Sequence, residues 1–105
     1  MDSLWFDPTE IFVGGVWRQA EGGKLPLENP STGDVICEIA RGAAADIDAA
    51  VHAADGALAG DWGRTSALER GRILTRIGQL VLTRVEELAA LEAADVGKPL
   101  SQARN

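Results

Sequence analysis

The first forty residues alternate short apolar runs with clusters of turn residues. In "EIFVGGVWR" two apolar runs flank Gly14-Gly15. Two glycines permit positive φ at both central positions, so the pattern predicts a tight hairpin. The segment "KLPLEN" is predicted to be extended, and "NPSTGD" is rich in turn residues. The alternation in "DVICEIA" then predicts a strand with Val35, Cys37 and Ile39 on one face.

Beyond residue 43 the apolar period changes to that of a helix. A first helix is predicted from Ala44 to Ala59, ended by Gly60, with the apolar stripe Ile47, Ala50, Val51, Ala54 and Leu58. Ser66 followed by Glu69 is a capping box and predicts the start of a second helix. The stripe of that second helix is Ile73, Leu74, Ile77, Leu80 and Val81.

The last third of the chain carries a break and two stop signals. Thr83 followed by Glu86 is read as a second capping box, which predicts that the helix breaks and restarts. Gly97 is well placed to end the restarted helix, and Pro99 is placed in the first turn of another. Taken only as physics, the chain is an α+β segment with a hairpin, a further strand and three helical pieces.

Composition and charge narrow the function classes. The 105 residues suit one small domain or part of a larger one, and abundant alanine limits the apolar area that can be buried. The net charge of −6 argues against a nucleic-acid partner. No apolar run is long enough to span a membrane, and the acidic N-terminus lacks the features of a secretory signal. With one cysteine and therefore no internal disulfide, the expected compartment is the cytoplasm.

Cys37 is the first candidate for chemistry, because a lone cysteine can serve as a nucleophile. Such a thiol needs a helix N-terminus, a cation or a histidine to lower its pKa. Cys37 instead falls in the middle of an alternating strand, so a structural role is favoured. Asp48, His52 and Asp55 share one helix face at metal-ligand spacing. That face lies opposite the apolar stripe, and a solvated surface is the preferred interpretation.

Two Gly-Lys pairs and three tryptophans complete the candidates. "GGK" at 22–24 and "GK" at 97–98 resemble phosphate loops, but Glu92 stands where the second pair requires glycine and Pro99 follows it. Nucleotide binding by these loops is therefore not expected. The tryptophans are widely separated in sequence and are interpreted as packing anchors: Trp5, Trp17 and Trp62.

Four segments in order resemble the N-terminal part of the NAD(P)-dependent aldehyde dehydrogenase superfamily. They are "IFVGGVW", "NPSTGDVICEIARGAAADIDAAV", "ALERGRIL" and "EELAALEAADVGKPLSQAR", and the match runs from about Ile11 to Arg104. The resemblance implies an α/β fold in which residues 1–105 open the dinucleotide-binding domain, locally α+β, with a β-hairpin and strand followed by peripheral helices. It also implies that the catalytic and oligomerisation parts lie outside the chain.

The same resemblance implies an enzyme that oxidises an aldehyde to a carboxylic acid with NAD or NADP, by thiol attack, hydride transfer and thioester hydrolysis. Its partners would be the remainder of the chain and further copies in a homo-oligomer. The family's nucleophilic cysteine, general base and cofactor-binding residues have no counterpart here, so this chain holds no catalytic and no cofactor-binding residue. Cys37 lies in a different motif from the nucleophile.

A structural monovalent cation, K⁺ or Na⁺, is the one binding site that the resemblance places partly in this chain. Its ligands would be the main-chain carbonyls of Leu27 and Glu28 together with Asp95. Further ligands would lie elsewhere, so the site would be incomplete. Two alternatives to an enzyme segment stay open: a non-catalytic α+β module that mediates oligomerisation or partner binding, and a truncated product that folds poorly.

Overall fold

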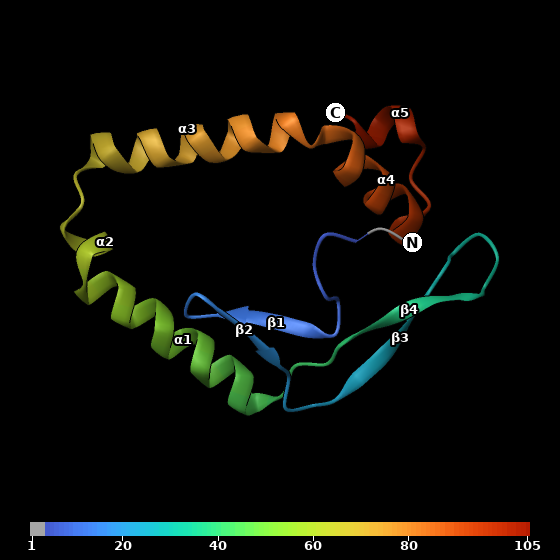
Figure 1. Ribbon diagram of the computed structural model, residues 1–105, viewed down its shortest axis with the longest axis horizontal. Helices are drawn as coiled ribbons and strands as arrows, with labels where there is room; N and C mark the ends of the chain where they lie inside the picture. Colours follow the sequence, from blue (N-terminus) through green and yellow to red (C-terminus); the bar gives the residue numbers. More distant parts are fainter. Residues whose placement is uncertain (1–3) are drawn as a thin grey trace. The chain divides into compact units, whose positions relative to one another are not determined.

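The computed structural model describes residues 4–105, which form four strands and five helices (Figure 1). The chain separates into two compact units: residues up to Leu27 with Val35–Arg64, and Glu28–Asp34 with Thr65–Asn105. The elements are, in order, β1 Glu10–Val13, β2 Val16–Gln19, β3 Lys24–Glu28, β4 Val35–Ala40, α1 Ala44–Ala59, α2 Asp61–Arg64, α3 Ala67–Thr83, α4 Val85–Val96 and α5 Leu100–Ala103.

Strands β1 and β2 form the predicted hairpin. They are antiparallel, and Val13 pairs with Val16 across the two-residue turn. Gly14 and Gly15 have φ of 61° and 81°, the left-handed angles that a two-residue turn of this kind requires. Phe12 faces Trp17 across the ladder, and their ring centroids lie 5.1 Å apart. This register places both rings on one face of the hairpin.

Strands β3 and β4 form a second two-stranded sheet, joined through the predicted turn "NPSTGD". The Asn29 amide donates to the carbonyl of Asp34 at 2.7 Å at the turn end. At the other end the Gly22 amide donates to the Arg41 carbonyl at 3.1 Å. A Cβ at Gly22 would lie 2.5 Å from that oxygen, so the close approach of the two backbones requires glycine there.

Helix α1 begins and ends where the apolar pattern predicts. Gly60 follows its last residue and donates to the Ala57 carbonyl at 3.2 Å. The short helix α2 that comes next was not predicted from the sequence. An ion pair between Arg64 and Asp61, at 2.7 Å, closes this single turn. A four-residue helix is too short to produce an apolar period, so the pattern gave no signal for it.

Helix α3 begins as predicted, but the restart at α4 has a different cause. The Glu69 amide donates to Ser66 Oγ at 3.2 Å, which caps α3. The second capping box is wrong: Thr83 Oγ1 donates back to the Leu80 carbonyl at 2.7 Å instead of capping α4. A threonine hydroxyl that bonds the preceding turn competes with onward helix geometry, and Arg84 separates the two helices.

Helix α4 ends at the predicted glycine. Gly97 has φ of 73° and donates to the Ala93 carbonyl, which is the expected left-handed stop. A Cβ at Gly97 would lie 3.4 Å from Pro30 Cγ, so the end of α4 lies beside the turn after β3. Pro99 immediately precedes α5 and is not within its first turn. Arg104 binds both carboxylate oxygens of Glu86, which ties α5 to the start of α4.

The described residues bury very little apolar surface. Ala89 is the single apolar residue among positions 4–105 that is fully buried. The predicted stripe of α3 lies largely in solvent, with Ile73, Ile77 and Val81 exposed to 44%, 52% and 47%. No helix of the described part combines the length and the apolar character needed to cross a membrane. The elements therefore form without an enclosed core around them.

Candidate functional site

The one charged side chain that the described residues bury is Asp46, in the first turn of α1. Its Oδ2 accepts hydrogen bonds from the amides of Glu21 and Ala43, both at 2.9 Å. Its Oδ1 accepts from Arg18 Nη2 at 3.1 Å. The carboxylate therefore connects the end of the β1–β2 hairpin to the N-terminus of α1.

These contacts also decide the protonation state of Asp46. The amides of Ala43 and Glu21, and then the charge of Arg18, hold the pKa of the Asp46 carboxyl below its ordinary value. The group is anionic at neutral pH, and its oxygens are already occupied by three donors. Such a carboxylate is a structural anchor and not a general base. No sequence pattern predicted this role for Asp46, although an acid three residues after the N-cap can accept the N-cap amide, as the second residue of a capping box does.

Cys37 lies in β4 with a half-buried, reduced side chain, as expected of a strand residue. Asp48, His52 and Asp55 are all exposed on α1. Across residues 4–105 the structure brings together no group of three or more His, Cys, Asp or Glu side chains that could hold a metal ion. Among the described residues, neither Cys37 nor the α1 group pairs a nucleophile with a base.

Both Gly-Lys pairs have backbone roles in the structure. Gly22 and Gly23 lie where β3 meets β4, and the Arg41 amide donates to the Gly23 carbonyl at 3.0 Å. Gly97 ends α4, and Lys98 Nζ forms an ion pair with Glu92 at 3.1 Å. Glycine at these positions serves sheet closure and helix termination, so neither pair forms a cradle of amides for a phosphate.

The predicted cation ligands fall in both units of the chain. Leu27 belongs to the first unit, whereas Glu28 and Asp95 belong to the second. Glu28 ends β3, and Asp95 is exposed in the last turn of α4. Within the second unit Gly97 lies against Pro30, so the segments that carry Glu28 and Asp95 are neighbours. The cation site itself stays a prediction.

Two of the hollows among residues 4–105 are the next candidates. One, of about 400 Å³, lies between the β1–β2 turn and the alanine face of α1, and it is lined by Phe12, Val13, Gly14, Gly15, Ala50, Ala53, Ala54 and Ala57. Those side chains are apolar and supply no acid, base or nucleophile. This hollow therefore offers packing surface and no chemistry.

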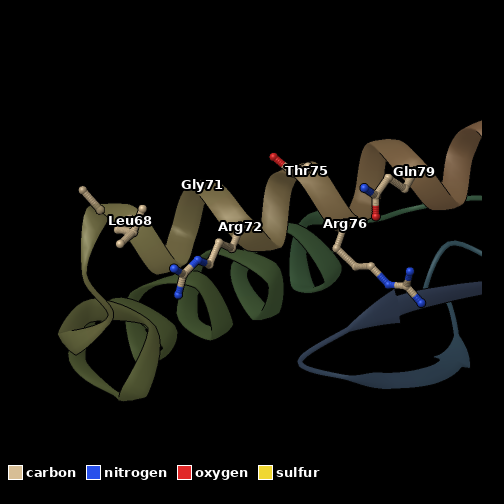
Figure 2. A pocket seen from close by; sticks show the side chains of 7 residues that line it. Leu68, Gly71, Arg72, Thr75, Arg76 and Gln79 are labelled. Carbon is tan, nitrogen blue, oxygen red and sulfur yellow. The ribbon is translucent and has the colours of Figure 1, made fainter.

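The other hollow, of about 620 Å³, runs along α3 (Figure 2). Figure 2 shows Arg72 and Arg76 extending on the same side of the helix. Arg72 is paired with Glu69 at 2.5 Å. The lining comes from α3 alone, namely Ala67, Leu68, Gly71, Arg72, Thr75, Arg76 and Gln79. A surface provided by one helix cannot enclose a substrate.

Comparison with known proteins gives one consistent result. The model of the aldehyde dehydrogenase family matches residues 17–105. Mitochondrial aldehyde dehydrogenase of Sus scrofa is 46% identical over 93 residues, which are 86% of this chain and 18% of that protein. Cytosolic 10-formyltetrahydrofolate dehydrogenase of Homo sapiens is 42% identical over 92 residues, 86% of this chain and 10% of that protein.

Solved structures agree with these relatives. A putative aldehyde dehydrogenase from Burkholderia cenocepacia is 50% identical and superposes with a TM-score of 0.85, over 89% of this chain and 20% of that one. The NAD⁺ complex of an aldehyde dehydrogenase from Bacillus cereus is 36% identical with a TM-score of 0.86, over 92% and 20% of the two chains. The chain thus spans about a fifth or less of the length of these relatives.

Proposed function

This chain belongs to the aldehyde dehydrogenase family, and we propose that it is the N-terminal segment of an enzyme that oxidises an aldehyde to a carboxylic acid with NAD. The observation that carries the proposal is the family match over residues 17–105. The agreement of the fold with a 50% identical solved structure supports it. The chain opens the dinucleotide-binding domain, and the domain's remaining strands come from residues outside it.

The contribution of this segment is structural. Its buried carboxylate, Asp46, is occupied by three donors, and its cysteine lies in a strand. The nucleophile, the general base and the cofactor-binding residues are supplied by the rest of the enzyme. The segment positions the edge of the cofactor domain through the Arg18–Asp46 link between hairpin and helix.

NAD is the proposed cofactor, because one of the similar solved structures, the aldehyde dehydrogenase from Bacillus cereus, is a complex with it. NADP is the alternative. A K⁺ or Na⁺ ion bound by the carbonyls of Leu27 and Glu28 and by Asp95 is part of the same proposal. The oxygen-only donors suit a hard cation, and Glu28 and Asp95 belong to the same compact unit. The enzyme is further proposed to be cytoplasmic and to act as a homo-oligomer.

The test is an activity assay on the full-length protein, by which we mean the product of the whole reading frame that contains this chain. It is purified and offered a panel of aliphatic and aromatic aldehydes with NAD⁺ or NADP⁺. Steady reduction of the cofactor with release of the matching acid is expected, faster with NAD⁺. A reading frame without a further cysteine motif, or no turnover across the panel, would contradict the proposal.

A further inference from the structure

We draw no further inference here: the strongest candidate, the apolar hollow between the β1–β2 turn and the alanine face of α1, is an open face of a chain that spans about a fifth of its structural relatives, and nothing in the structure shows what covers it in the full-length protein.

Discussion

At the scale of single residues, Asp46 joins segments that are distant in sequence, although no sequence pattern singled it out. It accepts the Ala43 amide at the start of α1, the Glu21 amide after β2, and the guanidinium of Arg18. All three bonds favour the ionised form. Ala43 is the N-cap residue of α1, and Asp46 in the first turn accepts its amide. The same carboxylate attaches the hairpin to that helix.

Replacing Asp46 with Asn should loosen the start of α1. The amide presents one oxygen where the carboxylate presents two, and it has no charge to pair with Arg18. We expect faster amide exchange by mass spectrometry in the peptides covering 18–22 and 43–50 of the full-length protein. D48N, an exposed change in the same helix, is the matched control and should leave both peptides unaltered.

The effect of D46N should depend on pH in one direction. Because the folded-state pKa of Asp46 is depressed, its stabilising contribution is present above the unfolded value of about 3.9 and is lost as pH falls through the folded value. The difference in exchange between wild type and D46N should therefore be full at pH 7 and vanish at pH values below the folded pKa. A difference that grows on acidification would contradict the assigned cause.

Cys37 is a potentially reactive residue type in a structural position. Its half-buried position in β4 predicts that Cys37→Ser leaves turnover of the full-length enzyme near normal. The hydroxyl costs about 1–3 kcal/mol of stability if it finds no partner. Steady-state kinetics and a thermal melt measure the two effects. A fall in kcat by orders of magnitude with the fold intact would make Cys37 part of the chemistry.

At the scale of elements, local signals account for most of the boundaries. The Gly14-Gly15 turn, the start of α3 at Ser66 and the left-handed stop at Gly97 were predicted, since each depends on residues adjacent in sequence. The failures involve contacts that sequence spacing does not reveal. The Thr83 hydroxyl donates to the Leu80 carbonyl instead of capping α4. Asp46 accepts hydrogen bonds from residues 25 and 28 positions away in the sequence.

The same distinction between local signals and distant contacts applies to the candidate site. The expectation that the chain holds no nucleophile–base pair rests on the single histidine and the single cysteine, which lie in different elements. The stacking of Phe6 on Trp17 could not be predicted, because the two rings come from segments that are separate in sequence. No periodicity connects those two residues.

Glycine at the end of α4 provides a test at this scale. Gly97→Ala forces a left-handed backbone on alanine and brings Cβ to 3.4 Å from Pro30 Cγ. A cost of about 1–2 kcal/mol is expected, seen as roughly tenfold faster amide exchange near the end of α4. Gly71→Ala is the control in open space within α3 and should stabilise that helix by up to about 1 kcal/mol. Equal effects of the two changes would contradict the account.

At the scale of the whole molecule, the exposed apolar side chains are the dominant feature. Ile47, Val51 and Leu58 of α1 are exposed to between 57% and 65%, and the stripe of α3 is similarly open. Two-stranded sheets are marginal without further strands or covering helices. The chain spans about a fifth of its structural neighbours, so the cover for these faces is expected from the rest of the enzyme.

The amide ¹H–¹⁵N NMR spectrum of purified 1–105, recorded at two concentrations, tests this account most directly. We predict poorly dispersed peaks, or lines that broaden with concentration, because the apolar faces of α1 and α3 either stay uncovered or associate between copies. Sharp, well-dispersed peaks that are independent of concentration would show a self-sufficient core. That result would contradict the assignment of this chain as a dependent segment of a larger dehydrogenase and favour a free-standing module.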